Sequence, residues 1–225
     1  MDNKLKFETH IDEKATKANA IMGVIRRAFR HLDSSTFSKL YKALVRPHLE
    51  YAQSVWSPHQ VKDIKKLEQI QRRATKQVGD LKNLSYKERL QRLKLPTLVY
   101  RRMRGDLIEV YKTLTGKYDP LVSDFLPLHN TVRGNRTRGH SLKLLKRDFR
   151  VDICRYSFSR RVVEPWNSLP EVVVSAPSLY SFENRLDRYW SKLDVKYDFE
   201  AALRQAVPFK PAPGKDQDLD TVASR

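Results

Sequence analysis

Cysteine is almost absent from this sequence, and glycine is scarce. Cys154 is the single cysteine, which excludes a disulfide framework and any zinc knuckle or ribbon that needs two or more cysteines. Only 7 of the 225 residues are glycine, and neither GxGxxG nor GxxxxGK occurs, so a glycine-rich phosphate-binding loop is excluded. No stretch approaches the roughly 18 apolar residues of a membrane-spanning helix, and MDNKLKFETH lacks the apolar region of a secretory signal. We expect an intracellular protein, nuclear or cytoplasmic, with no membrane partner.

Catalytic and metal-binding patterns are also missing. The six histidines are scattered, with no HExxH or HxH pair, and no GxSxG elbow occurs. A two-metal polymerase or nuclease needs clustered carboxylates, yet no two aspartates are adjacent. We therefore predict no catalytic residue, no metal site and no cofactor in this chain.

Acidic residues are the minority charge. Lysine and arginine number 44 against 26 aspartate and glutamate, which gives a net charge of +18 and a pI near 10.0. Residues 61–104 hold 14 basic and 4 acidic side chains, and residues 133–161 hold 10 and 2, so these two blocks account for the whole excess. The charge excess fits a polyanion, either nucleic acid or, second, an anionic membrane surface, and its segregation into two blocks favours nucleic acid, which is the partner we expect. The alternative is that both blocks are ordinary solvated helix faces.

Apolar spacing predicts a mostly α fold with a small α+β part. Helical periodicity covers 10–31, 61–78 and 97–115, with Thr97 as a cap, and Ser85 with Glu88 forms a capping-box pattern before another helix. We predict a helical domain over 10–117, a linker over 118–135, a small α+β domain over 136–193, and a disordered tail over 194–225. The α+β domain would hold a hairpin, because residues 142–144 and 149–153 alternate apolar and polar side chains.

Large aromatic side chains fall in phase with the apolar stripes. We therefore expect the following aromatic residues to pack in the core rather than to stack on bases: Tyr41, Tyr51, Trp56, Trp166 and Trp190.

A series of segments resembles the region after the palm in reverse transcriptases of LINE-type (non-LTR, jockey-like) retrotransposons. The resemblance covers roughly residues 2–193 and is carried by the following strings: LYKALVRPHLEYAQSVWSP (40–58), LEQIQRRATKQV (67–78), YKERLQRLKLPTL (86–98), YRRMRGDLIEVYKTLTG (100–116), TRGHSLKL (137–144) and FSRRVVEPWNSLP (158–170).

The resemblance implies the thumb and post-thumb part of an RNA-directed DNA polymerase. Residues 10–117 would be a helical thumb-like domain that grips a template–primer duplex of RNA and DNA, and residues 1–9 would be a remnant of the palm edge. The palm with its paired aspartates and Mg²⁺, and the fingers, would lie upstream in a full-length parent, so this chain would not be catalytic alone.

Basic side chains are the predicted nucleic-acid contacts, because guanidinium and ammonium groups bind phosphate oxygens. The predicted residues are Arg26, Arg27, Lys42, Arg46, Lys66, Arg72, Arg73, Lys76, Arg101, Arg102, Arg104, Arg136, Arg138 and Lys143. Two alternatives remain: a protein–protein or assembly module whose basic faces meet acidic partners, and a transposon remnant without a selected function.

Overall fold

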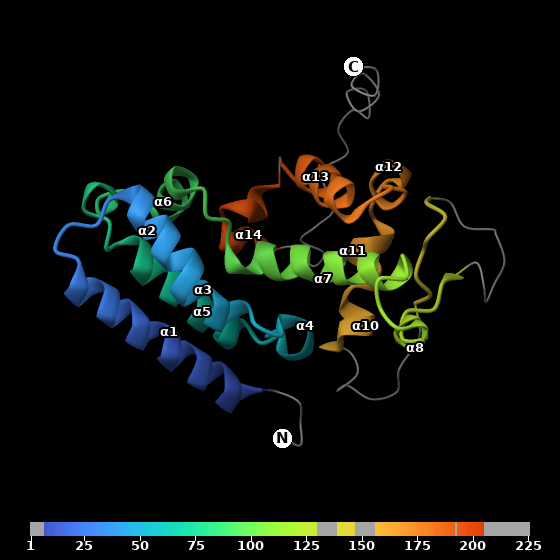
Figure 1. Ribbon diagram of the computed structural model, residues 1–225, viewed down its shortest axis with the longest axis horizontal. Coiled ribbons are helices and arrows are strands. Elements are labelled where there is room, and N and C mark those ends of the chain that lie inside the picture. The colour runs from blue at the N-terminus through green and yellow to red at the C-terminus, as the bar shows by residue number, and fades with distance from the viewer. Residues whose placement is uncertain (1–6, 130–138, 147–155, 192, 205–225) are drawn as a thin grey trace, which may run out of the picture.

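The fold is helical throughout the part of the chain that the structure describes. A computed structural model describes residues 7–129, 139–146, 156–191 and 193–204. Over these ranges it contains helices and no β-strand (Figure 1). The predicted mostly α class is therefore confirmed.

The first group of helices packs around one hydrophobic core. It comprises α1 (Glu8–Ala28), α2 (Ser34–Leu40), η1 (Tyr41–Val45), α3 (Arg46–Glu50), α4 (Gln53–Trp56), α5 (Val61–Thr75), η2 (Gly79–Leu81) and α6 (Tyr86–Leu93). Its core runs in sequence from Ile11 to Leu98 and includes the fully buried Phe37, Tyr41 and Leu49. The predicted capping box of Ser85 and Glu88 is present, and Asp33 caps α2 by accepting from the backbone N–H groups of Ser35 and Thr36.

The second group packs around a separate core. It comprises α7 (Leu98–Leu114), α8 (Pro120–Ser123), α10 (Phe158–Arg161), α11 (Val163–Asn167), α12 (Glu171–Val174), α13 (Leu179–Tyr189), η4 (Asp194–Lys196) and α14 (Phe199–Arg204). Trp166, Phe182 and Trp190 are 0% exposed and form the centre of this core. The predicted core positions of both tryptophans are thus confirmed.

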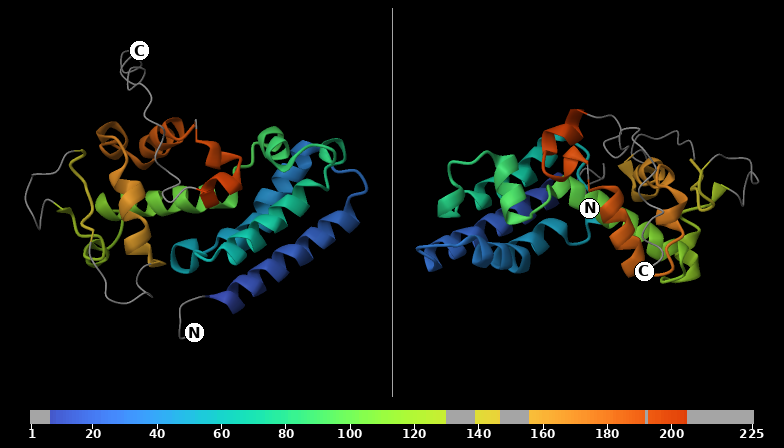
Figure 2. Two further views of the ribbon diagram at one scale, coloured as in Figure 1. Left: turned by 180° about the vertical axis from the view of Figure 1, so that it is seen from behind. Right: turned by 90° about the horizontal axis from the view of Figure 1, so that it is seen from above.

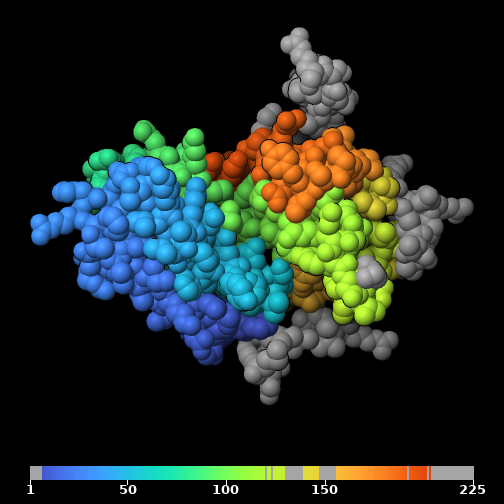
Figure 3. Space-filling model, viewed as in Figure 1, coloured from blue at the N-terminus to red at the C-terminus, as the bar shows by residue number. Residues whose placement is uncertain are grey.

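Helix α7 joins the two cores. Leu98, in its first turn, belongs to the first core, whereas Tyr100, Leu107 and Val110 belong to the second. Figure 3 shows atoms of α7 between the blue and the orange parts of the molecule. The second core therefore begins inside α7, and not after residue 117, where the sequence placed the end of the first domain.

The predicted linker over 118–135 is partly packed. Leu126 is 3% exposed, and Leu128 forms an isolated antiparallel bridge with Leu144. Leu144 was expected in a hairpin with residues 149–153, but those residues lie outside the described ranges. Leu144, which lies in the described part of the predicted hairpin, therefore pairs with Leu128 of the predicted linker.

The chain remains helical beyond residue 193, so the prediction of a disordered tail is wrong for residues 194–204. Val195 and Ala201 are buried in the second core, while Tyr197 and Phe199 pack against the first. Val195, Tyr197, Phe199 and Ala201 are spaced by two residues and not by a helical period, so local spacing does not predict these short helices, and the segment is ordered by its contacts with both cores. The rest of the predicted tail, 205–225, lies outside the described residues.

Candidate nucleic-acid interface

Helix α5 buries its acidic side chains and exposes its basic ones. Its two acidic side chains, Asp63 and Glu68, are 5% and 1% exposed. We define the α5 basic face as the exposed polar side chains of the helix and its C-cap: Lys62, Lys65, Lys66, Gln69, Arg72, Arg73 and Lys76. At 1.5 Å per residue this face is about 21 Å long. It presents six positive charges and no exposed negative one.

Helix α1 lies beside α5 and runs parallel to it (Figure 2). Three side-chain contacts join the helices, each across 54 residues of sequence. Lys62 Nζ donates to Glu8 at 2.9 Å, Lys66 Nζ donates to Asp12, and Arg73 donates to Asn19 Oδ1 at 3.3 Å. The constant separation means that the two helices keep one register over the length of the α5 basic face.

The C-terminal ends of α1 and α5 carry uncompensated cations. Arg26 and Arg27 lie exposed in the last turn of α1, and Arg72 lies exposed in the last turn of α5, before Lys76. Within the described part of the chain, none of these four side chains has a carboxylate oxygen within 4 Å. Cations are favoured at helix C-termini, so this concentration of positive charge costs the fold little.

Arg72 is held in place by an aromatic ring. Its guanidinium carbon lies 5.7 Å from the ring centroid of Tyr86, and that of Arg89 lies 5.6 Å from the same ring. Arg89 is 2% exposed and donates to Thr75 Oγ1 at 3.0 Å. Burial, followed by the nearby charge of Arg72, lowers the pKa of Arg89. Two guanidinium groups therefore share one ring, and the exposed one is partly ordered before any ligand binds.

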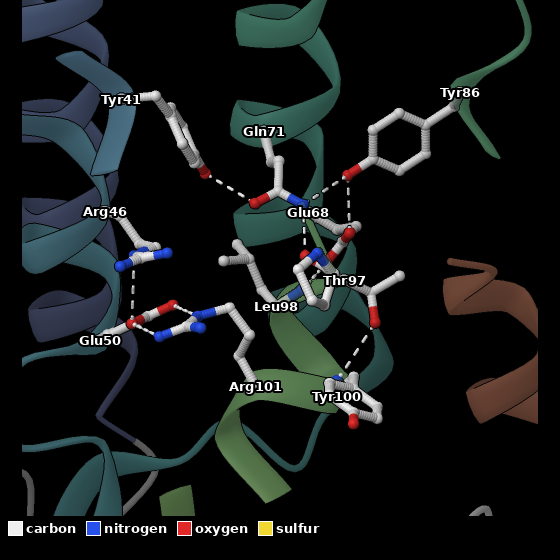
Figure 4. A network of polar contacts seen from close by, with 11 residues as sticks. Tyr41, Arg46, Glu50, Glu68, Gln71, Tyr86, Thr97, Leu98, Tyr100 and Arg101 are labelled. Atoms are coloured by element: carbon white, nitrogen blue, oxygen red, sulfur yellow. Dashed lines mark hydrogen bonds and ion pairs between the residues drawn. The ribbon is translucent and has the colours of Figure 1, made fainter. Parts of the chain in front are cut away.

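A buried polar network fixes α5 against α6 and α7 (Figure 4). Glu68 accepts from Tyr86 Oη at 2.7 Å and from the backbone N–H of Leu98 at 3.1 Å. Gln71 accepts from Tyr41 Oη at 2.8 Å. Burial raises the pKa of Glu68. This carboxyl group accepts a hydrogen bond at the N-terminus of α7 and so holds α5 against that helix. It is too buried to contact a substrate.

Arg101 and Arg104, both predicted phosphate contacts, instead bind carboxylates of the protein. Arg101 donates two hydrogen bonds to Glu50, one of them at 2.8 Å. Arg104 donates two to Asp187, at 2.7 and 2.9 Å. Arg101 and Arg104 are three residues apart and therefore point about 60° apart around α7, so that one reaches Glu50 of α3 and the other reaches Asp187 of α13. The predicted role of these two residues in phosphate binding is not supported by this geometry.

Arg102 is buried, and its prediction as a phosphate contact is wrong. It is 5% exposed, and its Nη1 has no hydrogen-bond partner among the residues that the structure describes. Burial lowers the pKa of Arg102, and the negative charges of Glu68, Glu50 and Asp106 oppose that shift. The guanidinium group therefore balances buried carboxylates and does not reach solvent.

The remaining predicted residues do not form one surface. Arg46 is half-buried and pairs with Glu50 at 3.6 Å. Lys42 is exposed on η1, which lies in front of α5 in Figure 1. Lys143 lies in the second group, with its side chain beside Gly139. Arg136 and Arg138 lie outside the described residues. The structure thus brings together Lys66, Arg72, Arg73 and Lys76, with Arg26 and Arg27 at the end of the neighbouring helix.

The sequence reasoning missed several residues. Lys62 and Lys65 belong to the α5 basic face. Their signal in the sequence is the three- or four-residue spacing of the polar positions 62, 65, 69, 72 and 76, on the side of the helix opposite its apolar residues. Arg161 connects the two groups of helices: it donates to Asp106 at 2.8 and 3.0 Å and to the Ser54 carbonyl at 2.7 Å. No local pattern signals Arg161, because its partners are 55 and 107 residues away.

The core prediction failed for one aromatic residue. Tyr41 and Trp56 are 0% and 2% exposed, as expected, but Tyr51 is 74% exposed. Helix α3 ends at Glu50, and Ala52 adopts a left-handed conformation with φ of 53°, so the chain leaves the helical phase at this point. The Tyr51 carbonyl accepts from the Trp56 indole N–H at 2.6 Å, which fixes the backbone while the ring projects outward.

The described residues hold no group of three or more histidine, cysteine, aspartate or glutamate side chains that could bind a metal ion. In the same ranges, no helix is both long enough and apolar enough to cross a membrane.

Comparisons with known proteins give one partial match. No protein-family model and no solved structure matches the chain. An uncharacterized protein of Caenorhabditis elegans is 30% identical over 121 residues, which cover 52% of this chain and 61% of that protein. The chain therefore matches somewhat less than two thirds of that relative's length.

Proposed function

We propose that this chain binds the phosphate backbone of a nucleic-acid duplex through the α5 basic face, as the thumb-like part of a LINE-type reverse transcriptase that grips template and primer. The observation that supports this most is the separation of charge on α5, which buries both of its acids and exposes six bases. The face is about 21 Å long, which equals roughly six base-pair steps along the axis of a duplex.

Backbone binding fits the chemistry of this face better than base readout. Lysine and arginine side chains on the exposed side of one helix contact phosphates without distinguishing sequences. The sequence strings 67–78 and 86–98, which resemble the polymerase thumb, include the C-terminal half of this face and helix α6. A thumb must move along many sequences, and contacts to phosphate permit that.

Replacing Arg72 and Arg73 with alanine should weaken duplex binding for all sequences alike. Each lost phosphate contact should make the slope of log affinity against log salt shallower by about 0.9. The measurement is a salt titration with two unrelated duplexes. The matched control is Lys39→Ala with Lys117→Ala, which removes two exposed charges outside the α5 basic face. An unchanged slope in the double variant would show that these arginines are not part of the interface. A loss of affinity for only one of the two duplexes would indicate base readout.

The isolated chain should not extend a primer. The paired aspartates that a two-metal polymerase requires are absent from the sequence. Purified protein is incubated with primer, template, dNTPs and Mg²⁺ or Mn²⁺, next to a mock preparation. Processive extension above the mock level would contradict the prediction and would reveal a catalytic site that the sequence pattern hides.

A second candidate function is a protein-assembly module. Leu121 and Phe125, in and after α8, are 73% and 71% exposed, and exposed apolar side chains that lie close together are typical of protein contacts. A salt titration with two unrelated duplexes distinguishes the two functions. Duplex affinity that falls steeply with salt and equally for both sequences supports the first, and absence of duplex binding in dilute salt favours the second.

A further inference from the structure

Helix α1 neutralises only the first half of the α5 basic face. In the common register of the two helices, Lys62 meets Glu8 and Lys66 meets Asp12, but Arg73 meets the neutral amide of Asn19. The residues beyond, Arg72 and Lys76, have no carboxylate within 4 Å among the described residues. In the first half of the face, two of the three lysines are thus neutralised, and Lys65 lies between those two pairs without an ion pair to a described residue; the second half is the positive half.

We propose that Glu8 and Asp12 are internal competitors for phosphate, and that they confine nucleic-acid contact to the positive half. This inference rests on the proposed function. The positive half consists of Arg72, Arg73 and Lys76 on α5, with Arg26 and Arg27 at the end of α1. The expected ligand is a short run of consecutive phosphates on one strand, placed across the C-terminal ends of the two helices.

The competition follows from geometry and charge. A phosphate that approaches Lys66 must displace the Asp12 carboxylate, and it is then repelled by that carboxylate at close range. The side chains of these pairs are 42–62% exposed, so the pairs add little to stability and their loss should not unfold the protein. At the other end, Asn19 accepts one hydrogen bond from Arg73 without cancelling its charge, and Arg72 lies over Tyr86.

Removing one carboxylate should extend the contact. In Asp12→Asn, Lys66 becomes available, and the slope of log affinity against log salt should become steeper by about 0.9. Affinity for a 20-base-pair duplex in dilute salt should rise roughly threefold or more. The matched control is Glu13→Gln, which removes the same charge from the next position of α1, where the exposed carboxylate forms no ion pair with a described residue. We expect it to leave the slope unchanged.

A double-mutant cycle separates competition from a general change in charge. Lys66→Ala should have little effect in the wild-type chain, because that lysine is already neutralised, but it should abolish the gain of Asp12→Asn. Circular dichroism checks that each variant is folded, and Glu8→Gln with Lys62→Ala repeats the test one turn earlier. Equal slopes for Asp12→Asn and Glu13→Gln, with normal binding by the wild type, would overturn this inference alone. Absence of binding by every variant would overturn the proposed function as well.

Discussion

Replacing Trp166 with alanine is expected to lower the free energy of unfolding by about 3–5 kcal/mol. Trp166 is 0% exposed, and its ring lies 5.8 Å from that of Phe182 and 6.1 Å from that of His140. Its indole N–H donates to the Leu142 carbonyl at 2.8 Å, so the substitution also leaves a partly buried acceptor without its partner. Domains of this kind are stable by about 5–15 kcal/mol, and this single change removes a large part of that.

The measurement is denaturant unfolding followed by circular dichroism. The matched control is Tyr180→Ala, which removes an aromatic ring that is 77% exposed on α13 and should change stability by less than about 0.5 kcal/mol. Nucleic-acid binding serves as a second readout. If Trp166→Ala left stability unchanged but abolished duplex binding, the residue would be a stacking platform and not a core residue.

Ending the chain after Leu193 is expected to destabilise it by about 3–6 kcal/mol, because the removed segment satisfies a buried cap. Thr97 is 0% exposed; its N–H donates to the Lys196 carbonyl at 2.9 Å, and its hydroxyl donates to the Val195 carbonyl at 2.7 Å. Thr97 also accepts from the Tyr100 N–H, as the N-cap of α7. The truncation therefore weakens the helix that joins the two cores, in addition to exposing the apolar surface that Val195 covers.

Thermal unfolding measures this effect, and a loss of this size should lower the melting temperature by roughly 10 °C or more. The matched control ends the chain after Arg204, which keeps η4 and α14, and we expect its melting temperature to change by only a few degrees. Equal melting temperatures for the two truncated chains would show that the segment 194–204 contributes nothing. Leu193 would then be the end of the stable fold, as the composition of the tail had suggested.

Local features of the sequence predicted the three longest helices, α1, α5 and α7, together with α6. These features each act within a few residues of the chain, so they are visible in the sequence without knowledge of the fold. They are the 3.6-residue spacing of apolar side chains, the capping box of Ser85 and Glu88, and Thr97 as the cap of α7. For the same reason, the sequence predicted that α5 has one apolar seam and many basic residues around it. The site was predictable to this extent, because amphipathic spacing determines which side of a helix faces solvent.

What the sequence determined by itself was the helical class, the location of the caps and the excess of positive charge. Only the tertiary structure decided which charges are available. Arg101, Arg102 and Arg104 look like Arg72 and Arg73 in the sequence. In the fold, however, α7 lies between two cores, where Glu50 binds Arg101, Asp187 binds Arg104, and the charge of Glu68 acts on the buried Arg102. Each of these carboxylates is more than 30 residues away in the chain. Helix α5 has one open side, so its arginines stay in solvent. The difference arises because burial and charge pairing depend on contacts between distant segments, and no local pattern records those contacts.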